Sequence, residues 1–368
     1  MLETHARRRA ALRSQLRERD LDALLVVDLR NVRYLTGFTG SNAALLVHAG
    51  DEPGTEDRTV FCTDGRYLTQ SAQQLPDLER LIDRPCPPAL VERAAASTDY
   101  RRTGYESHRV TVEDLDTLSG VAGGVELVRA PGLVERLRMV KDDNEIEALR
   151  MACAAADRAL ADLVEHGGLR AGRTEREVAR DLENRMLDHG AAGPSFESIV
   201  AAGANSAVPH HRPTDTVLHA GDLVKLDFGA LVDGYHSDMT RTFVLGTPAD
   251  WQRELYDLVA AAQAAGRAAL RVDAEVRDVD AAAREVVEDA GRGEEFLHGL
   301  GHGVGLEIHE APALAKTGEG RLSAGMAVTV EPGVYLSGKG GVRIEDTLVV
   351  RDGDPELLTL TTKQLVVV

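Results

Sequence analysis

The sequence predicts two domains, a smaller N-terminal α/β domain and a larger C-terminal α+β domain. From Leu21 to about Ala130, short strand-like runs alternate with helical runs, a pattern typical of α/β domains. The rest of the chain has long amphipathic helices between strand-rich segments, which favours helices packed against a largely antiparallel sheet. A chain of 368 residues is long enough for about two domains. We place the boundary after residue 135, which gives domains 1–135 and 136–368.

The N-terminal domain is predicted from short apolar runs separated by helical ones. The strand-like runs are Ala23 to Val27, Ala43 to Val47, Thr59 to Cys62 and Val125 to Arg129. The helical runs between them include Gly65 to Gln73 and Pro88 to Ala95. The segment Ala130 to Asn144 contains Pro131 and a charged run, so we expect it to lead into the second domain.

The C-terminal domain is predicted to contain four amphipathic helices. The first spans about Asp143 to Glu165. The second begins at Thr174, whose spacing to Glu177 is that of a capping box, and runs to His189. The other two are predicted at Pro248 to Val272 and at Val276 to Asp289. Two strand-rich segments, Leu223 to Gly246 and Met326 to Asp352, resemble each other faintly, because each has two strand-like runs joined by a glycine-containing turn.

The C-terminal domain carries four acids and a histidine that we identify as candidate metal ligands. They are Asp227, Asp238, His302, Glu331 and Glu345, each in a segment that reads as a β-strand. Acids on strands usually face solvent, but Asp227 and Glu331 lie in apolar surroundings, where a charge needs a strong partner. Four carboxylates and one imidazole can share a pocket only if cations cancel their repulsion. This mixture of ligands suits a pair of divalent ions, and it indicates a two-metal hydrolase.

A glycine-rich segment from His298 to His309 contains three of the twelve histidines. Its glycines at positions 299, 301, 303 and 305 are predicted to share one strand face and to leave room there for a ligand. His298 and His302 are predicted to share the other face. The spacing is not that of a phosphate-binding loop, because it does not form Gly-x-Gly-x-x-Gly.

Composition and charge narrow the classes of function. The chain has 60 acidic and 42 basic residues and a net charge of −18, which disfavours binding to nucleic acid or to anionic membranes. Cys62, Cys86 and Cys153 are odd in number and scattered, so neither a disulfide framework nor a cysteine metal site is expected. No apolar run is long enough to be a membrane span or a signal core, and we expect a cytoplasmic protein.

The candidate ligands lie in motifs that resemble those of a known family. They are Asp227-Phe-Gly-Ala-Leu-Val-Asp-Gly-Tyr-His-Ser-Asp238, the histidine segment, Val330-Glu-Pro-Gly-Val-Tyr335 and Arg343-Ile-Glu-Asp346. Together they closely resemble the pita-bread metallopeptidases, which include Xaa-Pro aminopeptidases, prolidases, methionine aminopeptidases and creatinase. In the N-terminal domain, Asn31-Val-Arg-Tyr-Leu-Thr-Gly-Phe38 and Thr63-Asp-Gly-Arg-Tyr67 look like proline-peptidase sequences. The resemblance implies a pita-bread catalytic domain behind a creatinase-like domain.

The resemblance also implies which residue binds which metal ion. Asp227 would bind one ion, Asp238 and Glu345 would bridge the two ions, and His302 and Glu331 would bind the second. The metal would be Mn(II), with Co(II) or Zn(II) as alternatives. Two such ions lower the pKa of water between them, so that it can attack the scissile carbonyl near neutral pH.

The remaining site residues carried over from the resemblance are histidines and residues that orient the ligands. Glu331 would accept the proton of the attacking water, and His309 and His210 would stabilise the oxyanion or hold the peptide. His298 would line a proline pocket. Tyr235, Thr240 and Arg343 are expected to orient the ligands. We interpret His211 and His236 as ordinary loop or surface histidines.

Within the family, the sequence favours an Xaa-Pro aminopeptidase. Methionine aminopeptidases resemble only the second half of the chain, and creatinase lacks the metal ligands. Prolidases often have an arginine four residues after the position of His309, where it holds the carboxylate of a dipeptide, but this chain has Ala313 there. The alternative is a prolidase in which another basic residue, from this chain or from a second subunit, holds the substrate carboxylate. In that case Arg343, given above as a ligand-orienting residue, or Arg212 would have a different role.

The resemblance further implies proline-containing peptides as substrates and a homodimer formed through the N-terminal domain. A more remote hypothesis is a pita-bread module that binds peptides without cleaving them. Such modules lose metal ligands, whereas this chain has all five.

Overall fold

The computed structural model describes residues 2–50, 52 and 54–368, which form two compact units. The first unit ends at Arg138 and the second begins at Met139. The boundary expected from the sequence, after residue 135, falls inside helix α6 (Leu133–Arg138). This helix is part of the first unit, where the buried Arg138 donates a hydrogen bond of 2.8 Å from Nη1 to Asn31 Oδ1.

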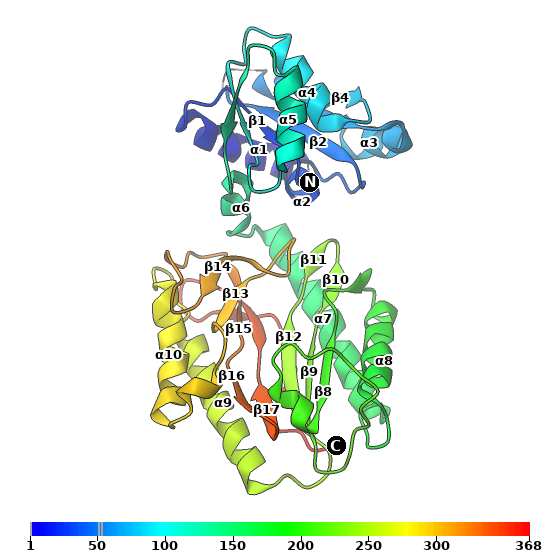
Figure 1. The fold of residues 1–368 in the computed structure, drawn as a ribbon, viewed down its shortest axis with the longest axis vertical. Coiled ribbons are helices and arrows are strands. Elements are labelled where there is room, and N and C mark those ends of the chain that lie inside the picture. The colour runs from blue at the N-terminus through cyan, green and yellow to red at the C-terminus, as the bar shows by residue number, and fades with distance from the viewer. Residues whose placement is uncertain (1, 51, 53) are drawn as a thin grey trace. The chain divides into compact units, whose positions relative to one another are not determined.

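The first unit is an α/β domain built on a mixed six-stranded sheet (Figure 1). Its strands are β1 (Ala23–Val26), β2 (Ala43–His48), β3 (Val60–Thr63), β4 (Glu79–Ile82), β5 (Arg102–Tyr105) and β6 (Glu126–Arg129). Its other helices are α1 (Leu2–Arg17), α2 (Leu29–Thr36), α3 (Leu68–Gln74), α4 (Cys86–Ala95) and α5 (Val112–Val121), with 3-10 turns at Thr55–Arg58 and Gly65–Tyr67. The strand order is β4-β3-β2-β1-β5-β6, in which β1 pairs antiparallel with β2 and parallel with β5.

The four strands predicted for this unit correspond to β1, β2, β3 and β6, but β4 and β5 were not predicted. β4 is mostly exposed and begins with Glu79 and Arg80, so it lacks the continuous apolar run that marks the buried strands. β5 is central, yet its sequence includes Arg102 and Gly104, residue types that are uncommon in strands. Gly104 is closely packed there, because a Cβ atom would lie 2.9 Å from Leu21 Cδ1, so a larger residue would require Leu21 to shift.

The second unit is an α+β domain of antiparallel strands and two helix pairs. The helices are α7 (Asp143–Glu165), α8 (Glu175–Asp188), α9 (Asp250–Ala269) and α10 (Val276–Asp289), with 3-10 turns at Gly203–Ala207 and Gly293–Glu295. The first strands are β7 (Gly193–Pro194), β8 (Ile199–Ala202), β9 (Leu223–Phe228), β10 (Ala230–Val232), β11 (Tyr235–His236) and β12 (Met239–Val244). The later ones are β13 (Gly301–Gly303), β14 (Glu310–Leu314), β15 (Ala327–Val330), β16 (Gly333–Leu336), β17 (Gly340–Arg343), β18 (Asp346–Val349) and β19 (Glu356–Leu357). None of the helices described in either unit has the length and apolar character needed to cross a membrane.

Each helix pair of the second unit forms its own hydrophobic core with the strands beside it. Leu160 of α7 and Leu182 of α8 pack in one core with strands β9 and β12. Val259 of α9 and Val279 of α10 pack in a second core with strands β15 and β18. Figure 1 shows the two helix pairs on opposite sides of the strands. The faint internal resemblance of the sequence therefore has a structural counterpart.

Three of the five predicted ligands lie at strand ends rather than inside strands, so that part of the prediction was wrong. Asp227 is in β9 and His302 is in β13, but Asp238 precedes β12, Glu331 follows β15, and Glu345 lies between β17 and β18. Glu331 ends its strand because Pro332 has no N–H to continue the ladder. The N–H of Glu345 donates instead to the carbonyl of Thr240 at 3.1 Å, which joins the two halves of the unit at the site.

The glycines of the histidine segment are also explained differently. β13 covers only Gly301–Gly303. A Cβ atom at Gly301 would lie 2.1 Å from Thr329 O, and one at Gly303 would lie 2.2 Å from Ala311 O. The space that we predicted for a ligand beside these glycines is therefore filled by the backbone of β15 and β14.

Candidate active site

One cavity of about 530 Å³ in the second unit brings the predicted site residues together. It is lined by all five predicted ligands, Asp227, Asp238, His302, Glu331 and Glu345. It is also lined by His210, His211, Arg212, His298, His309 and Arg343. Residues that are distant in the sequence therefore share one hollow, as the resemblance implied.

The centre of the site is a cluster of Asp238, His302 and Glu345. Each offers one ligand atom, and these three atoms lie within 4.8 Å of one another. His302 Nε2 is 3.5 Å from Asp238 Oδ2 and 3.3 Å from Glu331 Oε1. Its Nδ1 is 3.0 Å from the carbonyl of Gly303, an acceptor, so Nδ1 carries a proton and Nε2 faces the acids.

Asp227 stands apart from this cluster and is held by Arg343. Arg343 Nη2 donates to Asp227 Oδ2, and Arg343 Nε donates to Thr240 Oγ1 at 3.1 Å. Thr240 Oγ1 in turn donates to Glu345 Oε2 at 2.7 Å. Arg343 and Thr240 thus contact predicted ligands directly, whereas the hydroxyl of Tyr235 donates to Glu145 Oε1 of α7 at 3.1 Å.

Burial and mutual repulsion change the protonation of the cluster. Burial, together with the nearby charge of Asp227, raises the pKa of Asp238 to about 6, and burial raises that of Glu331 to about 7. Burial and the neighbouring carboxylates raise the pKa of Glu345 well above its ordinary value. Burial opposes a charge on His302, but its hydrogen bond to Asp238 and the charge of Glu331 raise its pKa to about 9. These groups therefore need positive charge, which protons or cations can supply.

The donor set fits divalent cations. Asp227 Oδ1 and Glu345 Oε1 are buried oxygens without a hydrogen-bond partner. Such oxygens are costly to bury unless something satisfies them. Carboxylate oxygens with one imidazole nitrogen suit divalent ions from Mn(II) to Zn(II).

The histidines around the cluster differ in how buried they are and in whether their ring nitrogens have hydrogen-bond partners in the protein. His298 Nδ1 donates to Gly299 O at 2.8 Å, and its Nε2 is 2.8 Å from the hydroxyl of Tyr335. Burial lowers the pKa of His298 to about 4, so the ring is neutral. His309 is exposed, and its ring centroid lies 4.4 Å from that of His302. His210 is also exposed, so these two rings face the open part of the cavity.

His211 and His236, interpreted as ordinary histidines, both have protein partners. His211 Nε2 lies 2.8 Å from Glu175 Oε2, and His236 Nδ1 lies 2.9 Å from Ser195 Oγ. His211 also lines the cavity, but its bond to a fully buried carboxylate makes it part of the scaffold.

Two supporting residues were missed by the sequence analysis. Glu175, the first residue of α8, is fully buried and accepts hydrogen bonds from the backbone of Ala202 and Thr214 at 2.9 and 3.0 Å. Lys225 is also fully buried, and its Nζ donates to Val208 O at 2.7 Å. Burial lowers the pKa of Lys225 well below its usual range. Lys225 was detectable, because it lies two residues before Asp227 on the same strand face. Nothing in the sequence pattern distinguishes Glu175.

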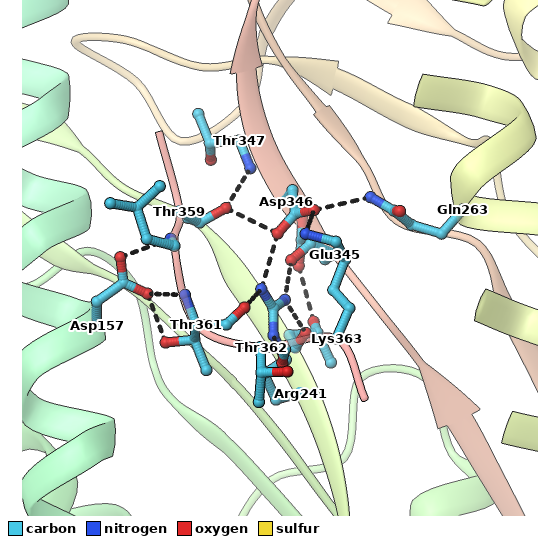
Figure 2. A network of polar contacts seen from close by, with 12 residues as sticks. Asp157, Arg241, Gln263, Glu345, Asp346, Thr347, Thr359, Thr361, Thr362 and Lys363 are labelled. Atoms are coloured by element: carbon cyan, nitrogen blue, oxygen red, sulfur yellow. Dashed lines mark hydrogen bonds and ion pairs between the residues drawn. The ribbon is translucent and has the colours of Figure 1, made fainter. Parts of the chain in front are cut away.

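A buried polar network lies behind Glu345 (Figure 2). Asp346, the first residue of β18, is contacted by Arg241 Nη2 (2.8 Å), Gln263 Nε2 (2.9 Å), Thr359 Oγ1 (2.9 Å) and Lys363 Nζ (2.8 Å). Arg241 also donates to the backbone carbonyls of Thr240 and Glu345. The network thereby joins the backbone of Glu345 to α9 and to the C-terminal segment 359–363.

Comparisons with known proteins agree with this geometry. The sequence pattern of metallopeptidase family M24 matches residues 147–352, and that of the Creatinase/Prolidase N-terminal domain matches residues 8–140. A Pyrococcus furiosus protein named Xaa-Pro dipeptidase is 34% identical over 350 residues, which cover 95% of this chain and 96% of that protein.

Solved structures resemble the whole chain. The Xaa-Pro dipeptidase from Bacillus anthracis is 36% identical with a TM-score of 0.93, and the match covers 99% of this chain and 100% of that one. The X-Pro aminopeptidase from Thermotoga maritima is 33% identical with a TM-score of 0.86, and the match covers 96% of this chain and 98% of that one.

Proposed function

This chain belongs to metallopeptidase family M24, and we propose that it hydrolyses the bond before proline in Xaa-Pro dipeptides. The observation that carries the proposal is the convergence of Asp238, His302 and Glu345 in one cavity, with the exposed His210 and His309 beside them. Relatives named Xaa-Pro dipeptidase, at 34% and 36% identity, match nearly the full chain. The peptide-binding alternative is disfavoured, because all five predicted ligands line the cavity.

The sequence alone favours an aminopeptidase, because Ala313 supplies no carboxylate-binding arginine. The relatives support the dipeptidase alternative better, since proteins named Xaa-Pro dipeptidase or prolidase recur among them, at up to 36% identity over nearly the whole chain. In β14, Ala313 is exposed and opposite His302 in the strand register. A dipeptidase built on this chain therefore has to bind the substrate carboxylate with a different residue.

The catalytic roles follow from where the groups lie. When bound, a pair of divalent ions supplies the Lewis acidity that activates water towards the scissile carbonyl. Glu331, which lines the cavity beside His302, accepts the proton of the attacking water and returns it to the proline nitrogen as the bond breaks. His309 and His210 donate hydrogen bonds to the carbonyl oxygen as its negative charge grows.

Asp227, Asp238, His302, Glu331 and Glu345 would hold the ions. We propose Mn(II) as the metal because the donors are mostly oxygen, with Co(II) and Zn(II) as alternatives. The homodimer and the cytoplasmic location stay predictions from the sequence.

The experiment that tests the proposal compares Ala-Pro, Ala-Pro-Ala and Ala-Ala as substrates of the Mn(II)-loaded protein. We expect release of proline from Ala-Pro, at least about tenfold slower cleavage of Ala-Pro-Ala, and no cleavage of Ala-Ala, because a site that binds a charged carboxylate loses that contact when the peptide is extended. A Glu345→Gln variant should lose both bound metal and activity. Equal rates on Ala-Pro and Ala-Pro-Ala would favour the aminopeptidase, and no cleavage of either by a metal-loaded protein would refute both.

A further inference from the structure

The loop that carries His210 is held in place on both sides by buried charged groups. In this loop, residues 208–214, Lys225 Nζ donates to Val208 O at 2.7 Å and to Pro209 O at 3.2 Å. After His210, the buried Glu175 binds His211 Nε2 at 2.8 Å and Thr214 Oγ1 at 2.7 Å. The residue between these anchors, Arg212, is therefore presented to the cavity from a fixed backbone.

Arg212 is the cavity-lining arginine whose guanidinium is exposed enough to bind a ligand. Among the cavity-lining residues that the structure describes, Arg212 and Arg343 are the two arginines, and lysine is absent. Arg343 is 2% exposed and already bonds Asp227, Thr240 Oγ1, Tyr335 Oη at 2.7 Å and Pro209 O at 3.2 Å. The side chain of Arg212 is 83% exposed.

The contact that Arg212 makes is a weak one that a ligand can replace. Its Nε lies 3.2 Å from Glu197 Oε2, and the Glu197 side chain is 62% exposed. Ion pairs between exposed side chains contribute little, because water screens them. The contact uses Nε, so the two terminal nitrogens of the guanidinium remain free for the paired hydrogen bonds that a carboxylate accepts. Glu197 also lines the cavity, so a carboxylate that enters it meets both residues.

We propose that Arg212 binds the free C-terminal carboxylate of the dipeptide and thereby takes the place of the arginine that Ala313 lacks. Glu197 holds Arg212 at the cavity when no substrate is present and competes with the substrate carboxylate for it. This inference rests on the proposed dipeptidase function and assigns its specificity to one residue outside the predicted ligand set.

The test compares Ala-Pro with Ala-Pro amide, whose C-terminus is uncharged, in the wild type and in Arg212→Met. We expect Arg212→Met to lower kcat/KM for Ala-Pro by about tenfold or more, mainly through KM, because a charge-assisted hydrogen bond is lost. The rate on Ala-Pro amide should change much less, so the preference for the dipeptide should collapse. Arg212→Lys should recover part of it.

A matched control and a second variant make the test specific. Arg176 is also exposed and pairs with Asp215 at 3.5 Å outside the cavity, so Arg176→Met should keep the wild-type preference. Glu197→Gln removes the competing carboxylate, so it should lower KM for Ala-Pro more than KM for Ala-Pro amide. If Arg212→Met keeps the wild-type preference for Ala-Pro over its amide, the carboxylate is bound elsewhere and this inference is wrong, while the dipeptidase function stands. If the wild type shows no such preference, the proposed function itself fails.

Discussion

At the scale of single residues, hydrogen bonding separates the histidines that support the site from those that can serve the substrate. His298 has both ring nitrogens bonded, to Gly299 O and to the hydroxyl of Tyr335, which also accepts from Arg343. This chain of contacts fixes the tautomer of His298 and leaves only its ring surface for proline. His309 is exposed and beside His302, so its ring is the better placed to donate to a reacting carbonyl.

The role of His309 gives a prediction for His309→Ala. Metal content should stay near that of the wild type, while kcat falls about 100-fold, the usual scale for loss of one transition-state donor. Metal analysis and steady-state kinetics on Ala-Pro measure the two effects. His219→Ala is the control, because His219 is 72% exposed and does not line the cavity. Loss of metal together with activity would show that His309 is a ligand.

A second residue-scale prediction concerns Glu106 in the first unit. Burial raises the pKa of this carboxyl from 4.5 to about 7, although its Oε2 accepts hydrogen bonds from the N–H groups of Val27 and Asp28 at 2.7 and 2.8 Å. A raised pKa means that folding favours the protonated form, so this contribution to stability is full below pH 4.5 and is lost as pH rises through about 7.

Urea unfolding at a series of pH values between 4.5 and 8 tests whether the contribution of Glu106 to stability falls as pH rises. The wild type should lose stability across this range, and Glu106→Gln should show a smaller decline, whatever its absolute stability. Parallel pH profiles for the two proteins would mean that Glu106 stays ionised throughout.

At the scale of elements, the sequence predicts helices better than strands in this chain. The predicted bounds of α7 and α10 agree with the structure, because apolar periodicity is a local signal, and the start of α7 is also marked by a capping box between Asp142 and Glu145. Strand ends depend on partners that are far away in the sequence. Glu331 and Glu345 leave their strands to bond Leu300 O and Thr240 O, and no local pattern indicates those contacts.

The network behind Glu345 gives an element-scale prediction for Asp346→Asn. The carboxylate is fully buried against Arg241 and Lys363, so removing its charge leaves two cations without their partner. We expect a loss of about 3–5 kcal/mol in the free energy of unfolding. Metal affinity should also fall, because Arg241 positions the backbone of Glu345.

Chemical denaturation and metal titration measure these effects. The matched control is Asp354→Asn, since Asp354 is 94% exposed in its ion pair with Arg271, and its loss should cost at most about 1 kcal/mol. If the two variants are equally stable, the network does not hold the strand.

At the scale of the whole molecule, the site depends on both halves of the second unit. Asp227 and Asp238 come from the half built on α7 and α8, while His302, Glu331 and Glu345 come from the half built on α9 and α10. The family resemblance pointed to these five residues, and the structure places all five in the lining of one cavity. The supporting roles of Glu175 and Asp346 could not be predicted, because they arise from contacts between distant segments.

Because the ligands belong to the second unit, metal removal should destabilise that unit selectively. A ligand that binds only the folded state raises the free energy of unfolding, by about 4 kcal/mol when its concentration is a thousand times its Kd.

The chain has one tryptophan, Trp251 of α9, which packs against the core of the second unit. Its fluorescence therefore reports the unfolding of that unit, whereas calorimetry also records the first. We expect a chelator to lower the midpoint of the fluorescence transition by several degrees and Mn(II) to restore it, while a separate calorimetric transition of the first unit stays in place. If both transitions moved together, the two units would unfold as one cooperative body, and a midpoint unaffected by the chelator would contradict the metal site itself.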